Sequence, residues 1–450
     1  MGQFFDFLAS FEDMAWSCFG FPAIIAMGLY LTYKSRFVQL RHFPHVVKTF
    51  LSLMFRKEKS ANGIHPIKAF FACVGGCVGI GNIVGVTTAV QLGGPGAVFW
   101  IWITAMAGAL IKYAEVYLGM RYRVASGNGG YLGGPMYFFA KAFSNPFIVK
   151  LFCVLMCLYG VEVFQFSVMA ATVSENFGVS KLVVSLSFLA LVIIAEIGGL
   201  KRISTICSAI IPFFIVVYLG MGFYVLACNI TSLPTVIVDI LHYAFTPHAA
   251  FGAFIGSTMM SSISQGIRRA CYSCDIGVGY ASIIHSESSV ENPAHQASLT
   301  IFEVFLDTFI ICTMSLIIVL VTGTWAQDIA PIYLVQNALS NYFPYMNLFL
   351  PVLLFLLGYS TIITYFCSGM KTATFLSPKY GRRLYYLYAV IVLLLFSFVD
   401  TAQANSVMSC VLVLLLGLNL AAIWRLRHEL QFDFAPEASK EALTQVVLAD

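Results

Sequence analysis

The stretch ACVGGCVGIGN, residues 72–82, carries four glycines, Gly75, Gly76, Gly79 and Gly81, inside an apolar run long enough to cross a membrane. Glycine weakens helices, and in hydrocarbon each freed backbone N–H or C=O costs several kcal/mol unless another group satisfies it. Close packing against a neighbouring helix is the ordinary use of one such glycine. These four do not share one helical face, so the stretch predicts a helix whose backbone opens toward a ligand.

Composition places this stretch in an integral membrane protein. The chain has 450 residues, of which 59% are hydrophobic and 10% charged, against roughly 25% charged in a soluble globular protein. Nearly all of the 12 cysteines fall in apolar runs, where Cys behaves as a small apolar residue. Cys271 and Cys274 have CxxC spacing but stand without a second pair, so no metal or organic cofactor is predicted.

Apolar runs of about 17–25 residues, the length of a membrane-crossing helix, predict an all-α protein with eleven spans. The segment 251–284 is too long and too polar for one simple helix, so a break is predicted within it. The eleven runs are Met14–Tyr33, Phe70–Gln91, Ala97–Tyr117, Val149–Ala171, Leu182–Leu200, Ile203–Leu226, Phe251–Ile284, Leu299–Thr322, Leu348–Met370, Leu384–Val399 and Val407–Trp424.

The basic residues predict how these spans are oriented, because Lys and Arg collect on the cytoplasmic side of membranes. With the N-terminus outside and the C-terminus in the cytoplasm, every Lys and Arg except Lys181 is assigned to the cytoplasmic side, Lys112, Arg268 and Arg269 among them. The net charge of +4 therefore reflects topology and gives no reason to expect a nucleic-acid partner. The acidic N-terminal run lacks the basic region of a signal peptide, so a retained first span is predicted.

An opened helix in the bilayer is how many secondary transporters bind small charged substrates. Amides at the start of a half-helix hold a carboxylate, and unwound carbonyls hold a cation. A channel fits less well, because the polar positions form no continuous pore lining or charge ring. A membrane-embedded enzyme or an ATP-driven pump is also disfavoured, because no HExxH, GxSxG or GxxxxGKS/T motif is present.

Several ordered motifs resemble one transporter family. They are GNIVGVTTAVQLGGPGAVFWIWITAMAGALIKYAEVYLGMRYR (81–123), GGPMYFF (133–139), GGLKRI (198–203), IRRACYSCDIGVGYASIIH (267–285) and DTFIICTMSLIIVLVTG (307–323). In sequence and order these segments closely resemble the alanine/glycine:cation symporter family. The resemblance implies the leucine-transporter fold, with two inverted repeats of five spans, each with a discontinuous first helix, preceded by one extra helix. The corresponding parts are 1–69 for the extra helix and a cytoplasmic loop, 70–230 and 231–425 for the repeats, and 426–450 for a cytoplasmic tail.

The resemblance also implies a function. It predicts a secondary symporter of the cytoplasmic membrane that imports alanine or glycine with a cation, sodium in the first place. Two segments, SCDIG (273–277) and TYFCSG (364–369), depart from the family pattern, which leaves the identity of the amino acid open. The alternative keeps the fold and couples a different small amino acid to protons. Apart from the amino acid and the lipid bilayer no partner is predicted, and the oligomeric state stays open.

Roles for individual residues follow from the matching segments. The Ile80 and Gly81 amides are expected to face the substrate carboxylate, and the predicted substrate-binding residues are Cys77, Gly79, Ile80, Gly81, Asn82 and Gln165. The predicted sodium ligands are the Val78 carbonyl and the hydroxyls of Ser360 and Thr361. Structural roles are the alternatives, since Gln165 can bond between helices and the two hydroxyls can bond to the preceding helical turn.

Three carboxylates in the predicted spans form a candidate proton site, because charges inside a membrane are costly and suggest a function. Glu162 stands where the resembled family has an asparagine. Glu303 stands where it has a glycine, one turn before Asp307, although Glu303 can instead lie near the cytoplasmic interface.

Overall fold

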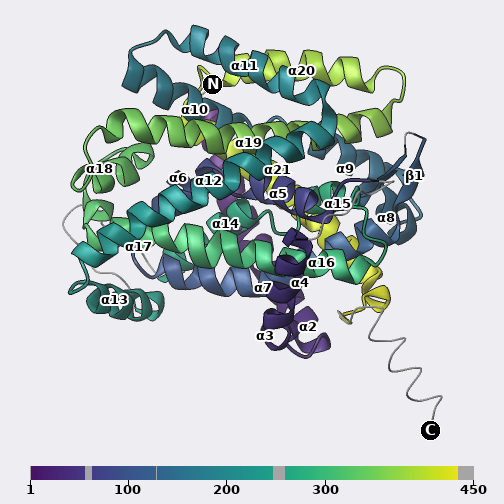
Figure 1. Ribbon diagram of the computed structural model, residues 1–450, viewed down its shortest axis with the longest axis horizontal. Coiled ribbons are helices and arrows are strands. Elements are labelled where there is room, and N and C mark those ends of the chain that lie inside the picture. Colours follow the sequence, from purple (N-terminus) through teal and green to yellow (C-terminus); the bar gives the residue numbers. More distant parts are fainter. Residues whose placement is uncertain (1, 56–62, 128, 247–258, 434–450) are drawn as a thin grey trace.

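A computed structural model describes residues 2–55, 63–127, 129–246 and 259–433. These residues form a bundle of helices with one short hairpin of two strands (Figure 1). The strand β1, Val124–Ser126, pairs antiparallel with β2, Gly130–Leu132. The described part of the chain is therefore helical in its architecture, as the sequence predicts.

The first half of the chain opens with a long helix that passes through a π-helical turn, and it contains one helix in two pieces, α5 and α6. Its helices are α1 Gly2–Ala15, η1 Trp16–Gly20, α2 Phe21–Lys34, α3 Val38–Arg41, α4 Phe43–Phe55, α5 Pro66–Cys77, η2 Ile80–Asn82, α6 Val84–Gly93, α7 Ala97–Arg121, α8 Pro135–Ala142, α9 Pro146–Tyr159, α10 Val163–Phe177, α11 Lys181–Ile197, α12 Gly199–Cys228 and α13 Leu233–Phe245.

The second half also contains a helix in two pieces, α14 and α15, followed by a helix with a π-helical middle, α16 to α17. Its helices are α14 Met259–Cys274, α15 Tyr280–His285, α16 Pro293–Val304, η3 Phe305–Cys312, α17 Thr313–Val321, η4 Thr324–Ala326, η5 Pro331–Tyr333, α18 Leu334–Ser340, α19 Met346–Leu376, α20 Gly381–Phe396, α21 Thr401–Arg425 and η6 Arg427–Glu429.

Local sequence signals explain why several helices begin where they do. The side chains of Asn145, Asn292 and Asp400 accept hydrogen bonds from N–H groups two residues on, at 2.9, 2.9 and 2.8 Å. These are N-cap bonds, which satisfy donors that the first turn of a helix leaves free. A proline stands in the first turn of α5, α9 and α16, where its missing N–H has no partner to lose and its fixed φ suits the helix.

Among the described residues, seven helices are long and apolar enough to cross a membrane, or eight when α5 and α6 are counted as one bent span. They coincide with eight of the predicted apolar runs. The other three runs correspond to α11 with 17 residues, α20 with 16 residues, and the pair α14 and α15. The chain is thus a multi-span membrane protein, and the count of eleven stays a prediction.

The predicted break in the glycine-rich helix is present. The axes of α5 and of η2 with α6 differ by 60°. Between them Val78 and Gly79 have extended backbone, with φ of −78° and −129°. The helix therefore changes direction at the glycine cluster.

The segment 251–284 is also broken, between α14 and α15. Asp275, Gly277 and Gly279 have positive φ of 54°, 71° and 89°. Glycine adopts this region without the steric cost that a Cβ brings. The beginning of the predicted segment, with Gly256, lies outside the described residues.

Helices from the two halves pack against one another. α7 contacts α14 and α16, α14 contacts α6, and α15 contacts α5. Figure 1 shows α5, α14 and α15 toward the middle of the bundle, with α11 and α20 side by side at one edge. The two broken helices therefore lie together in the interior.

Three basic residues that charge sorting assigned to the cytoplasmic side lie inside helices. Lys112 is 1% exposed in α7. Arg268 of α14 pairs with Glu12 of α1 at 2.9 Å, and Arg269 follows it in the same helix. Charge sorting counts every Lys and Arg as a loop residue, whereas the structure places these three within helices, where a buried basic group with an acidic partner can stay in the membrane. The side of the membrane on which they lie stays a prediction.

Candidate functional site

The first helix break leaves backbone N–H groups that two side-chain amides satisfy. The Gly79 N–H donates to Asn82 Oδ1 at 2.9 Å, and the Ile80 N–H donates to Gln165 Oε1 of α10 at 2.9 Å. Amides at the start of a half-helix carry the partial positive charge of its dipole. The structure thus brings Gln165 to the opened backbone. Its Oε1 accepts from the Ile80 N–H, a backbone donor that could also bind a carboxylate.

Two glycines of this break differ in what surrounds them. A Cβ added at Gly79 would lie 2.5 Å from Thr361 Oγ1 and 3.0 Å from Gln165 Nε2. A Cβ added at Gly81 would lie 3.4 Å from the Tyr272 ring, which is an ordinary contact distance. Position 79 therefore has to be glycine for both polar side chains to approach the backbone.

The predicted sodium ligands lie beside the same break. Thr361 of α19 donates its hydroxyl to the Gly75 carbonyl at 3.2 Å, near the end of α5. Ser360 donates to Leu357 O of its own helix at 2.8 Å, which is the local bond that a buried serine commonly makes. The structure therefore places the Thr361 oxygen on the broken helix, while the Ser360 proton is used within α19.

A buried carboxylate, Asp307, collects donors from three elements near this break. Asn82 Nδ2 donates to Asp307 Oδ1 at 2.6 Å. Ser273 Oγ, Cys274 Sγ and Thr308 Oγ1 donate to Asp307 Oδ2 at 3.0, 2.9 and 3.1 Å. Asp307 lies in the π-helical segment η3, a form that occurs frequently at functional sites. Carboxylate and hydroxyl oxygens in one place suit a hard cation.

Lys112 connects the ends of both broken helices. Its Nζ lies 2.9 Å from Cys77 Sγ at the end of α5 and 3.1 Å from the Cys274 carbonyl at the end of α14. The same atom forms an ion pair with Glu303 Oε2 at 3.4 Å. A cation between two helix C-termini complements the negative ends of both dipoles.

Glu303 has a second partner, His285 Nε2, at 2.7 Å. Cys73, His285 and Glu303 present potential metal ligands within 4.8 Å of one another. The Lys112 ammonium is bound to the same carboxylate and repels a metal ion, so the geometry favours an ion-pair network. Glu303 is 1% exposed, so its side chain lies inside the bundle.

The second break is satisfied by a carboxylate. The Gly279 N–H donates to Glu115 Oε2 at 3.1 Å, and Asn419 Nδ2 donates to the same oxygen at 2.7 Å. Glu115 lies on α7, one turn after Lys112. One face of α7 therefore supports both breaks.

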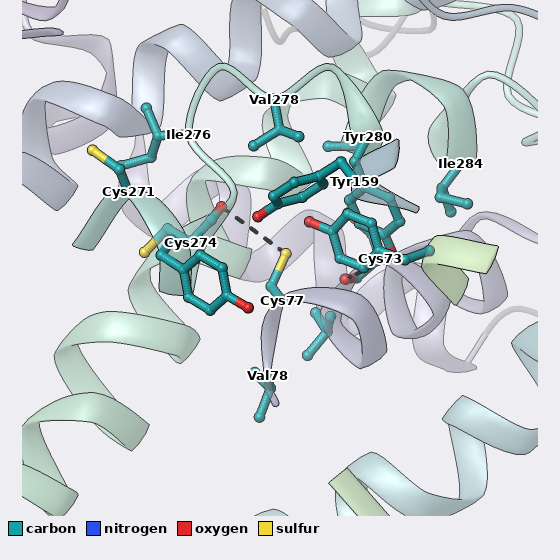
Figure 2. Close-up of a cluster of buried hydrophobic side chains, with 14 of the residues drawn as sticks. Cys73, Cys77, Val78, Tyr159, Cys271, Cys274, Ile276, Val278, Tyr280 and Ile284 are labelled. Carbon is teal, nitrogen blue, oxygen red and sulfur yellow. Dashed lines mark hydrogen bonds between the residues drawn. The ribbon is translucent and has the colours of Figure 1, made fainter. Parts of the chain in front are cut away.

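A group of acidic and tyrosine side chains lies between the breaks. Glu162, with a positive φ of 48° at the start of α10, accepts a hydrogen bond from the Tyr272 hydroxyl at 3.0 Å. Tyr159 and Tyr365 have ring centroids 5.3 Å apart. Among the described residues, the Tyr159 hydroxyl and Asp275 Oδ2 have no hydrogen-bond partner, and the Tyr365 hydroxyl faces the Asp275 carboxyl. In Figure 2, Cys77 points its sulfur toward the Cys274 carbonyl, with which it forms a hydrogen bond at 4.0 Å (dashed line).

Sequence reasoning missed Lys112 and the tyrosines as site residues. Lys112 carried a usable signal, because it and Glu115 stand one helical turn apart in an otherwise uncharged apolar run. Tyr159 and Tyr365 carried none, because a tyrosine in a membrane span does not show whether its hydroxyl has a partner.

Known transporters are similar to this chain over most of its length. The profile described as "Sodium:alanine symporter family" matches residues 1–435. An uncharacterized transporter of Haemophilus influenzae is 35% identical over 326 residues, 71% of this chain and 70% of that protein. The sodium/alanine symporter AgcS of Methanococcus maripaludis is 30% identical over 401 residues, 87% of each protein. The probable sodium/glutamine symporter GlnT of Bacillus subtilis is 32% identical over 402 residues, 88% of this chain and 82% of that protein.

A solved structure shares the fold. A crystal structure of a mutant manganese transporter of Eremococcus coleocola superposes with a TM-score of 0.51, covering 79% of this chain and 75% of that chain. The two sequences are 13% identical, so the likeness concerns the fold alone.

Proposed function

The chain belongs to the sodium:alanine symporter family, and we propose that it imports a small amino acid together with sodium. Its family consists of secondary transporters, so the protein is a membrane transporter and not an enzyme. Alanine is named for the family and one relative, and glutamine for another. The observation that carries the proposal is the first break, where Gln165 and Thr361 meet opened backbone.

The substrate carboxylate would bind at the start of the second half-helix, formed by η2 and α6. The Ile80 and Gly81 amides would be its donors, with Cys77 and Asn82 flanking them. The Ile80 amide now donates to Gln165 Oε1, so a carboxylate would take over or share this donor. Gln165 Nε2 could then donate to the carboxylate.

The coupling sodium would bind where α19 meets the same break. The oxygens of Val78, Ser360 and Thr361 are its proposed ligands, and the bond from Thr361 to the Gly75 carbonyl supports this position. Asp307 and the hydroxyls around it form a second oxygen-rich group that fits a cation.

For the architecture, we propose the leucine-transporter fold with eleven spans. The two breaks, in α5 to α6 and in α14 to α15, would then open the first helix of each inverted repeat, 70–230 and 231–425. The protein would lie in the cytoplasmic membrane with its N-terminus outside and its C-terminus in the cytoplasm.

A reconstituted system tests the proposal. Purified protein in proteoliposomes should take up radiolabelled amino acid when an inward sodium gradient is imposed and should lose this uptake when potassium replaces sodium. Thr361→Val should raise the sodium concentration for half-maximal uptake. Equal uptake with and without the sodium gradient would contradict sodium coupling.

Proton coupling is the second candidate, and Glu162 is the residue that favours it. Glu303 is held by Lys112 and His285, and Asp307 by its donors, whereas the Tyr272 hydroxyl is the one partner that the described residues give Glu162. At a fixed sodium gradient, proton coupling would make uptake rise as the external pH falls, and Glu162→Gln would flatten this dependence. Equal pH curves for the two proteins would rule out this role of Glu162.

A further inference from the structure

The acidic and tyrosine side chains between the breaks form a defined group, which we call the acidic chamber: Tyr159, Glu162, Tyr272, Asp275 and Tyr365. All five are buried, none more than 7% exposed. They come from α9, the start of α10, α14, the second break and α19. Residues far apart in the sequence therefore bring two carboxylates and three hydroxyls to one place.

The acidic chamber lies one helical turn from the groups that would bind the amino acid's main chain. Tyr365 follows Thr361 by four residues on α19, so these two share one face of that helix, and Glu162 is the residue directly before α10, three residues before Gln165. The Tyr272 ring is the nearest neighbour of a Cβ built at Gly81. An amino acid whose carboxylate binds the opened backbone would therefore direct its amino group and side chain toward the acidic chamber.

The carboxylates of the acidic chamber differ from the other buried carboxylates in their partners. Glu303 has a lysine and a histidine, Asp307 has five donors, Cys312 Sγ among them, and Glu115 has a backbone and a side-chain amide. In the described parts of the chain, by contrast, no ion pair includes Glu162 or Asp275. The acidic chamber thus has an excess of acceptors.

The hydroxyls add to this excess. Tyr159 and Tyr365 are fully buried; the Tyr159 hydroxyl bonds to no other described residue, and the Tyr365 hydroxyl faces the Asp275 carboxyl. Buried polar groups are nearly always hydrogen-bonded, so such a group in a native site requires an explanation. A ligand that donates several hydrogen bonds supplies one.

We infer that the acidic chamber selects an amino acid whose short side chain ends in an N–H donor, a carboxamide or an ammonium group, over one that ends in a methyl group. Asp275 would accept from the α-amino group, and Glu162 with the tyrosine hydroxyls would accept from the side chain. This inference rests on the proposed function and names the substrate class within it. A site built to hydrogen-bond a substrate rejects an analogue that lacks the group, because its own buried polar atoms stay unpaired.

Uptake measurements test the inference directly. Proteoliposomes with a fixed inward sodium gradient are given radiolabelled alanine, asparagine, glutamine, 2,4-diaminobutyrate or aspartate. We expect kcat/KM for asparagine or diaminobutyrate to exceed that for alanine by about tenfold or more, and aspartate to be excluded. Whichever of asparagine and diaminobutyrate has the higher kcat/KM shows whether an amide or an ammonium group is the preferred donor. Glutamine, with one more methylene, tests how long the side chain can be.

Variants locate the preference. Tyr159→Phe and Tyr365→Phe, which remove only a hydroxyl, should each reduce the preference over alanine about fivefold or more. Tyr385→Phe on α20 is the matched control, because its buried hydroxyl also lacks a described partner but lies outside the acidic chamber. It should leave the preference unchanged. Glu162→Leu should reduce the preference strongly.

The possible outcomes distinguish a failure of this inference from a failure of the proposed symporter function. Sodium-driven uptake of alanine that equals or exceeds uptake of asparagine and diaminobutyrate overturns the inference and leaves the symporter intact. No sodium-driven uptake of any of the five contradicts the proposed function itself. A change in pH dependence in Glu162→Gln without any change in substrate order assigns Glu162 to proton coupling and contradicts its role in selection.

Discussion

An alanine at position 79 is the smallest change that should damage both the substrate site and the sodium site. The added Cβ would lie 2.5 Å from Thr361 Oγ1 and 3.0 Å from Gln165 Nε2, below or at the limit of normal contact. Both side chains must therefore withdraw. Gln165 would lose its 2.9 Å bond to the Ile80 N–H, and Thr361 its 3.2 Å bond to the Gly75 carbonyl.

The size of the effect follows from what is left unpaired. A buried polar group that loses its partner costs about 1–3 kcal/mol. If Gln165 also contacts the bound carboxylate, its withdrawal weakens substrate binding by the same amount, which is about five- to 150-fold. The displaced Thr361 hydroxyl should at the same time raise the sodium concentration for half-maximal binding.

Gly85→Ala is the matched control, since nothing lies within 4 Å of a Cβ built at this position of α6 and Gly85 is not among the proposed substrate or sodium ligands. Equilibrium binding of radiolabelled alanine and asparagine is measured for the wild type and both variants over a range of sodium concentrations. Size-exclusion profiles and melting temperatures show that the variants are folded. Unchanged substrate and sodium affinities in a folded Gly79→Ala protein would refute the reasoning, as would equal losses in both variants.

Three further changes probe other parts of the site. Lys112→Met should lower the free energy of unfolding by about 3–5 kcal/mol, because it leaves the buried Glu303 carboxylate without its ion-pair partner. Adding Glu303→Met should recover part of the lost melting temperature, and no recovery in the double variant would contradict the ion-pair role. Gln165→Ala should weaken substrate binding by about 1–3 kcal/mol without raising the sodium requirement, and an unchanged dissociation constant would assign Gln165 to helix packing. Asp307→Asn should raise the sodium concentration for half-maximal uptake, and the same sodium curve as wild type would remove Asp307 from the cation path.

The sequence predicted the position of the first break, and that the segment 251–284 contains the second, because glycines and polar residues inside an apolar run have a direct physical consequence. Gly79 and Gly277 mark positions where the backbone leaves the helix. The approach of Gln165 to the first break followed from the family resemblance, since nothing in its own segment indicates which backbone amide it meets.

The partners of the charged residues could not be predicted in the same way. Asp307 draws its donors from η2, α14 and its own π-helical segment, and spacing along the chain does not show that these converge. Charge sorting treated Lys112 as a loop residue because the rule takes no account of its ion-pair partner Glu303. A rule based on one residue at a time fails where a buried charge depends on a partner.

The contacts of Lys112 also set the order in which the protein can be completed during synthesis. Its partner Cys274 is made 162 residues later, and Glu303 later still. At about 5–20 residues per second, the lysine waits about 8–30 seconds. During that time an unpaired charge at the centre of a helix costs about 2.5–3.5 kcal/mol in the bilayer. The first half of the chain therefore carries this charge without its ion-pair partner until α14 and α16 have been made.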